Sequence, residues 1–163
     1  MSSILQLLFS GLVGAIIGAL LYAWIAWKII KRQVDAMRLL QRRSQIEQTL
    51  TALTALREEM LLNQKQNEGP FKDYLAASFS TEIWGSVVDK VQWKDRVRVE
   101  SITRVYARVF ALLACTKFFS LRPTQAGSDV GGLWEGLQPL FLPALRSLDD
   151  ELHDHSVELQ QIE

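Results

Sequence analysis

The sequence predicts an all-α protein in which a single N-terminal transmembrane helix continues into a long cytoplasmic helix, followed by a small helical bundle or hairpin. Three observations lead to this fold class. Residues 4–27 form an apolar run without a charge, residues 28–67 contain neither glycine nor proline, and the apolar residues of 96–119 recur at helical spacing. With 163 residues in total, the part behind the apolar run suffices for one small domain.

The apolar run from Ile4 to Trp27 has 24 residues. As a helix it measures about 36 Å, which exceeds the roughly 30 Å of hydrocarbon in a bilayer and allows a modest tilt. Lipid offers no partner for a free backbone amide, so a helix is the expected form. The residues expected to anchor its cytoplasmic end at the headgroup layer are aromatic or basic. They are Tyr22, Trp24, Trp27, Lys28, Lys31 and Arg32.

The distribution of charge predicts the orientation of this helix. Arg38, Arg42 and Arg43 extend the basic cluster, and no charged side chain precedes the run. The positive-inside rule therefore places residues 1–3 outside and the C-terminal part in the cytoplasm. A bacterial inner (plasma) membrane is the default compartment, and an organellar inner membrane remains open.

A cleaved signal peptide is the main alternative to a permanent anchor. A signal peptide starts with basic residues, has a shorter apolar core and ends in a small-x-small motif. Here Met1–Ser3 carries no charged side chain, the core is long, and Ala23 and Ala26 have the wrong spacing. We therefore expect an uncleaved anchor, with cleavage or burial in a soluble complex as alternatives.

Small side chains occur at intervals of four along the apolar run, an arrangement that lets two membrane helices approach closely. These rows predict a helix-packing face, although they do not say whether the partner is a second copy or a different subunit. The predicted face consists of Ser10, Gly11, Gly14, Ala15, Gly18 and Ala19.

Residues 28–68 are expected to form a long basic helix, or stalk, that ends at Gly69-Pro70. Leu39, Ile46, Leu53 and Met60 recur every seven residues, but the complementary heptad row contains two arginines. The wide apolar stripe favours packing against later helices of the same chain. A homotypic coiled coil is the alternative.

Residues 69–150 are expected to form a small helical cytoplasmic domain. Candidate helices cover 71–79, 80–91 and 96–119, and Asp95 is the expected N-cap of the last. A hairpin around Lys94-Asp95 is the alternative to a helix–turn–helix there. Pro139 and Pro143 should break or kink the helix of 133–148.

Two further segments have distinct compositions. Residues 120–132 are expected to form a loop, mobile or partner-binding, because glycine, serine and proline are frequent there. Residues 151–163 are expected to be an acidic tail, and the chain is expected to fray after Asp149. Between Pro123 and the end, Arg146 is the only lysine or arginine.

No motif in the chain indicates catalysis, a cofactor or a metal. Phosphate-binding glycine loops and paired-cysteine metal motifs are absent, and the single cysteine, Cys115, lies among apolar residues. The run from Asp149 to His155 could form two carboxylate–histidine pairs on a helix, but the two histidines diverge, so we expect a solvated polar tail. We predict no catalytic, cofactor-binding or metal-binding residue, and no enzyme.

Function therefore has to be predicted from organisation alone. The expected partners are the lipid bilayer and a protein, or a second copy, that binds the transmembrane helix. Nucleic acid is not expected because the basic residues alternate with acidic ones. We expect a membrane-anchored helical interaction or scaffold protein, an accessory or assembly subunit of a membrane complex. The alternative is a small membrane-active effector, such as a toxin, phage or defence protein, that oligomerises through its transmembrane helix.

Overall fold

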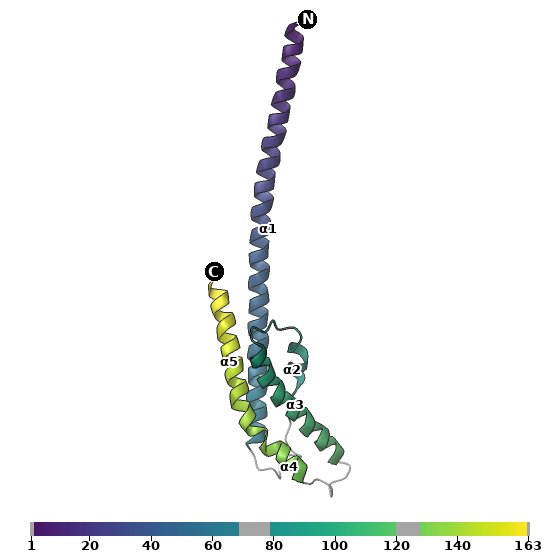
Figure 1. Ribbon diagram of the computed structural model, residues 1–163, viewed down its shortest axis with the longest axis vertical. Helices are drawn as coiled ribbons and strands as arrows, with labels where there is room; N and C mark the ends of the chain where they lie inside the picture. Colours follow the sequence, from purple (N-terminus) through teal and green to yellow (C-terminus); the bar gives the residue numbers. More distant parts are fainter. Residues whose placement is uncertain (1, 69–78, 120–127, 163) are drawn as a thin grey trace. The chain divides into compact units, whose positions relative to one another are not determined.

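The computed structural model describes residues 2–68, 79–119 and 128–162 (Figure 1). The protein is all-α, as predicted, and no strand occurs within these ranges. The chain divides into two compact units, Met1–Ser44 and Gln45–Glu163. The helices are α1 (Ser2–Asn67), α2 (Glu82–Val87), α3 (Arg96–Phe119), α4 (Ser128–Glu135) and α5 (Gln138–Gln160).

The first unit is helical throughout its described length and belongs to α1. The prediction of one continuous helix through residues 28–67 is confirmed, because good helix formers fill this stretch without a glycine or proline. None of the described side chains between Gly11 and Ser44 is buried. By length and composition, α1 contains a stretch apolar enough to cross a membrane, and none of that stretch is buried within the protein.

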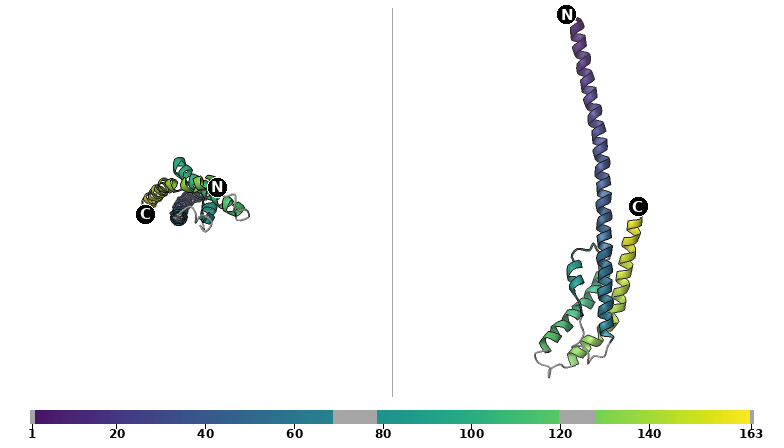
Figure 2. Two further views of the ribbon diagram at one scale, coloured as in Figure 1. Left: turned by 90° about the horizontal axis from the view of Figure 1, so that it is seen from below. Right: turned by 180° about the vertical axis from the view of Figure 1, so that it is seen from behind.

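The second unit has a single apolar core to which all five helices contribute. Figure 2 shows α5 and α2 on opposite sides of the C-terminal part of α1, and α3 packs against α5. From α1, the side chains of Leu53, Leu56 and Met60 are completely buried in this core. This confirms the prediction that the apolar stripe packs against later helices. A homotypic coiled coil along the heptad of Leu39, Ile46, Leu53 and Met60 is therefore wrong, because its last three positions are already buried.

Helix α3 presents the predicted apolar face to the core, where Ile102, Val105 and Val109 are fully buried. Its N-terminus is capped as expected: the Asp95 carboxylate accepts a hydrogen bond from the Val97 amide at 2.8 Å. Residues 88–95 are turn and coil rather than strand, so the hairpin alternative is wrong.

The C-terminal region differs from the sequence prediction in three places. Residues 128–132, expected to be loop, belong to α4 because Val130 is buried in the core. The chain does break before Pro139, which lies in the first turn of α5, but Pro143 lies inside α5 without ending it. Neighbouring buried side chains, among them Phe141 and Ala144, hold this turn against the core.

The expected fraying from Asp149 is also wrong, since α5 continues to Gln160. Its last turns carry the buried polar residues Glu151 and His155. The hydrogen-bond donors to Glu151 come from the segment that begins α3. Cys115 is half-buried against the core. The helix expected over 71–79, except for its last residue, and the loop expected over 120–127 lie outside the described residues.

Candidate functional site

A buried carboxylate joins three helices of the second unit. Glu59 of α1 accepts hydrogen bonds from the Ser80 hydroxyl at 2.7 Å and the Ile83 amide at 2.9 Å through Oε2. Its Oε1 accepts from the Trp84 amide at 3.2 Å and the Tyr106 hydroxyl at 2.8 Å. We call these five residues the Glu59 clamp. A carboxylate has about four acceptor positions, two on each oxygen, and all of them are used here.

The Glu59 clamp explains why so short a helix as α2 is stable. Thr81 occupies its N-cap position but makes no side-chain cap hydrogen bond. The Glu59 carboxylate takes over this capping role. Its oxygens accept hydrogen bonds from the free amides of the first turn, and its negative charge is favourable at the positive end of the helix dipole. Burial, and then the hydrogen bond to Glu59, raises the pKa of the Tyr106 hydroxyl. The Trp84 ring stacks on Tyr106 with centroids 4.8 Å apart.

Two asparagines extend this polar row along the buried face of α1, at intervals of four residues. Asn63 pairs with the Ser80 backbone, donating to its carbonyl at 2.7 Å and accepting from its amide at 2.8 Å. Asn67 donates to the Trp134 carbonyl at 3.1 Å. The row therefore fixes the segment before α2 and the last turn of α4 to α1.

A second buried carboxylate, Glu151 of α5, lies in an ion-pair network with the start of α3. It accepts a hydrogen bond from the Lys94 amide and one from the Arg98 guanidinium at 2.9 Å. Arg98 also donates to Asp154 at 2.7 Å. This hydrogen bond lowers the pKa of the Asp154 carboxyl, and both carboxylates raise the pKa of Arg98.

His155 is buried beside this network. Its Nε2 lies 3.6 Å from Glu151 and its Nδ1 lies 4.0 Å from Glu158, distances too long for hydrogen bonds. Lys94 forms an ion pair with Glu158 at 2.8 Å. No group of three metal-ligating side chains occurs in the part of the chain that the structure describes.

Five of the six residues predicted to pack in the membrane, all except Ser10, lie on the exposed surface of the first unit. A Cβ atom added at Gly11, Gly14 or Gly18 would meet no atom within 4 Å, so another helix has room to approach there. Ala15 and Ala19 are also exposed. The Ser10 side chain lies outside the described residues. The helix-packing face stays a prediction.

The predicted interface anchors are exposed and interact with one another. The Lys28 ammonium lies 5.1 Å from the centre of the Trp24 ring, and the Lys31 ammonium lies 5.5 Å from that of Trp27. Both are cation–π pairs at an interval of four residues. Tyr22 is exposed on the same helix, as is Arg32. The pairs keep each cation next to a ring of the type that prefers the headgroup layer.

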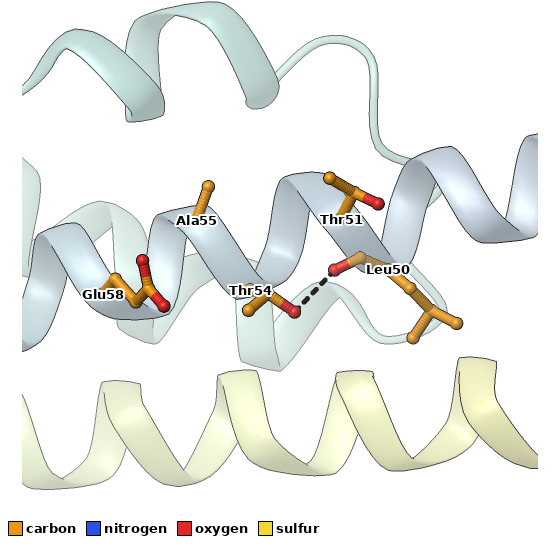
Figure 3. Close-up of a pocket in the computed structure, with 5 residues that line it drawn as sticks. All are labelled: Leu50, Thr51, Thr54, Ala55 and Glu58. Atoms are coloured by element: carbon orange, nitrogen blue, oxygen red, sulfur yellow. Dashed lines mark hydrogen bonds between the residues drawn. The ribbon is translucent and has the colours of Figure 1, made fainter.

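A shallow groove of about 430 Å³ lies on the surface of α1 in the second unit (Figure 3). Thr54 donates to the Leu50 carbonyl at 2.8 Å, so its hydroxyl is already used. Glu58 is the only charged residue of the lining. The groove therefore offers little polar chemistry. It is lined by Leu50, Thr51, Thr54, Ala55 and Glu58.

Sequence motifs do not single out Glu59, and the prediction of a solvated polar tail is wrong for Glu151, which is completely buried. Each of the two carboxylates nevertheless has a weak signal in the sequence. Glu59 interrupts the apolar stripe next to Met60, and Glu151 lies four residues before His155. Acidic residues are rarely buried without a partner, and the partners are distant in sequence. No known protein family, curated protein or solved structure matches the chain.

Proposed function

We propose that the protein is a single-pass membrane-anchored helical interaction protein, an accessory or assembly subunit of a membrane complex. One observation carries this proposal. The stretch between Val13 and Trp27 has no charge, and none of its described side chains is buried. In water such a surface is costly at roughly 25 cal/mol per Å² of apolar area, so a bilayer is its natural environment.

The charge pattern supports a cytoplasmic position for the second unit. Lys28, Lys31 and Arg32 follow the apolar stretch directly and pair in part with its terminal tryptophans. Cations at this position are retained on the cytoplasmic side. An inner (plasma) membrane with the C-terminus in the cytoplasm is part of the proposal.

The polar chemistry of the second unit supports an interaction role rather than catalysis. The Glu59 carboxylate has no acceptor position left, and Glu151 is held by Lys94 and Arg98. Both carboxylates stabilise helix packing. A rigid helical unit tethered to a membrane binds partners more effectively, because confinement raises its effective concentration at the surface.

Membrane extraction tests the anchor. We expect the full chain to stay in the membrane pellet after alkaline carbonate washing, and the double variant Ile17→Arg/Leu20→Arg to become soluble, because arginine at the centre of a span costs about 2.5–3.5 kcal/mol. Leu62→Arg is the matched control, since Leu62 is an exposed leucine of the second unit. Full release of the unchanged chain by carbonate contradicts the proposal.

Cysteine labelling tests the orientation. In a Cys115→Ser background, Gln92→Cys should react with a membrane-impermeant maleimide only after the cells are opened, because Gln92 is exposed on the second unit. Labelling of intact cells at this position would place the second unit outside and contradict the proposed orientation.

A further inference from the structure

The first unit carries an unbroken row of side chains spaced alternately three and four residues apart, which we call the α1 seam. Every position from the first to the eighth is apolar, and the last two are uncharged polar residues. The α1 seam consists of Val13, Ile16, Leu20, Ala23, Trp27, Ile30, Val34, Met37, Gln41 and Ser44. We propose that this seam binds a second copy of the chain in a parallel two-stranded coiled coil.

The seam needs a protein partner beyond the end of the apolar stretch. Ile30, Val34 and Met37 follow the first basic residues, where lipid chains no longer cover the helix, and they are 56%, 40% and 67% exposed. These side chains form a continuous apolar row along a stalk that also carries the exposed apolar residues Ile29, Leu39 and Leu40. The charged residues between 28 and 44 all lie off the seam: Lys28, Lys31, Arg32, Asp35, Arg38, Arg42 and Arg43.

The period of the seam identifies the kind of partner. Alternate steps of three and four give a repeat of 3.5 residues, whereas an ideal straight α-helix has 3.6 and drifts by about 20° in each heptad. A row that keeps the shorter period from Val13 to Ser44 matches a helix that supercoils with the first. The heptad of Ile46, Leu53 and Met60 cannot pair with another helix in this way, because those residues are buried in the second unit.

The polar end of the seam favours a second copy over a different helix. A glutamine side chain carries both donors and an acceptor, so Gln41 can pair reciprocally with Gln41 of an identical helix in register. Ser44 can do the same one turn later. A single polar residue in such a seam selects register and partner number. A fully apolar partner would leave the Gln41 amide without a hydrogen bond.

The flanks of the seam determine the direction of the pair. Lys31 and Arg38 lie on one flank, and Gln33 and Leu40 lie on the other. Parallel pairing sets Arg38 beside Gln33 of the second copy, which can accept its hydrogen bond. Antiparallel pairing would bring the two cationic flanks together. The inference depends on the proposed membrane anchoring in one respect: two copies anchored in the same membrane already point in the same direction.

The seam does not use the predicted helix-packing face. Gly14 and Gly18 lie off it, as do Ala15 and Ala19, so the two faces are separable by substitution. A self-pairing seam leaves the small residues accessible to a different membrane helix.

Cross-linking in membranes tests the seam. In a Cys115→Ser background, Met37→Cys places a thiol in the seam, and Leu39→Cys is the matched control on the outer side of the stalk. Oxidation with copper phenanthroline should give a disulfide-linked species of twice 18.5 kDa for Met37→Cys. We expect at least about tenfold less for Leu39→Cys, because a disulfide needs Cβ atoms about 4 Å apart. Equal yields at both positions, or no product from Met37→Cys, would overturn the proposal.

A second measurement separates failure of the seam from failure of the anchor. Two differently tagged copies should co-purify in mild detergent, and Val34→Asp should abolish this while leaving the protein in the carbonate-washed pellet. Gly14→Ile is the control that should leave co-purification of the two copies unchanged. If the tagged copies separate but Met37→Cys links to another protein, the seam binds a different helix and the second-copy proposal is wrong.

Discussion

Replacement of Glu59 by alanine should destabilise the second unit more than any change at a neighbouring exposed acid. The substitution removes the acceptor of four hydrogen bonds at once, and the donors come from α2, α3 and the segment before α2. Two of these donors are the Ile83 and Trp84 amides, which belong to the first turn of α2 and have no alternative acceptor within that helix.

The magnitude follows from the donors left without a partner. The donors of Ser80 and Ile83, which are both half-buried, can turn toward water in part, whereas the Tyr106 hydroxyl and the Trp84 amide are buried. A buried donor without an acceptor costs about 1–3 kcal/mol. The variant no longer buries a carboxylate, and this gain offsets part of the cost of two buried donors, which leaves a loss of about 2–4 kcal/mol. Glu59→Gln keeps the volume and one oxygen and should cost about 1–2 kcal/mol.

Urea unfolding of the full chain in mild detergent, followed by tryptophan emission, measures this loss. Trp84 reports on the site because its ring stacks on Tyr106. With a slope of about 1.5 kcal/mol per M, a loss of about 3 kcal/mol lowers the midpoint by about 2 M. Glu58→Ala is the control, since Glu58 is exposed and should change stability by less than about 0.5 kcal/mol. Equal midpoints for the two alanine variants would refute the reasoning.

Four further predictions concern the second unit. Because the pKa of Tyr106 is raised in the folded protein, this tyrosine ionises first in the unfolded chain as pH rises above its ordinary pKa of 10.0, and the free energy of unfolding falls from there upward. In Tyr106→Phe, the urea midpoint should therefore depend less on pH between about pH 9 and about pH 11. Arg98→Met leaves the buried Glu151 charge without its cation and should cost about 3–5 kcal/mol at neutral pH in the same assay. Because the pKa of Asp154 is lowered by Arg98, its contribution is present above 3.8 and is lost as pH falls through the lowered value, and an acid titration of Arg98→Met should lack this loss. Gly85→Ala should raise stability by about 0.5–1 kcal/mol, because the added methyl group meets no atom within 4 Å; a decrease in the thermal midpoint would contradict this.

The elements that were predicted correctly are those with a local cause. The long helix follows from a stretch without glycine or proline, and the start of α3 follows from Asp95, which caps an amide two residues away. The apolar face of α3 follows from its own spacing. The helix-breaking effect of Pro143 was overestimated. Its cost is offset by contacts in the core, and the residues next to it in sequence do not indicate these contacts.

The candidate site could not be predicted in the same way, because its contacts are distant in sequence. Glu59 and Tyr106 are 47 residues apart, and Arg98 and Glu151 are 53 residues apart. A lone acidic residue in a helix has the same appearance in sequence whether it is solvated or buried, since the difference lies in the donors that another helix supplies.

The amino-acid sequence by itself determined the helical class, the extent of the charge-free stretch and the basic residues that follow it, because helix propensity and hydropathy act over neighbouring residues. Only the tertiary structure decided which heptad of α1 is buried in its own core and which remains exposed. It also decided that Glu59, Glu151 and His155 are interior residues. Burial of a polar side chain depends on partners that approach only when the chain folds, and the local sequence does not contain them.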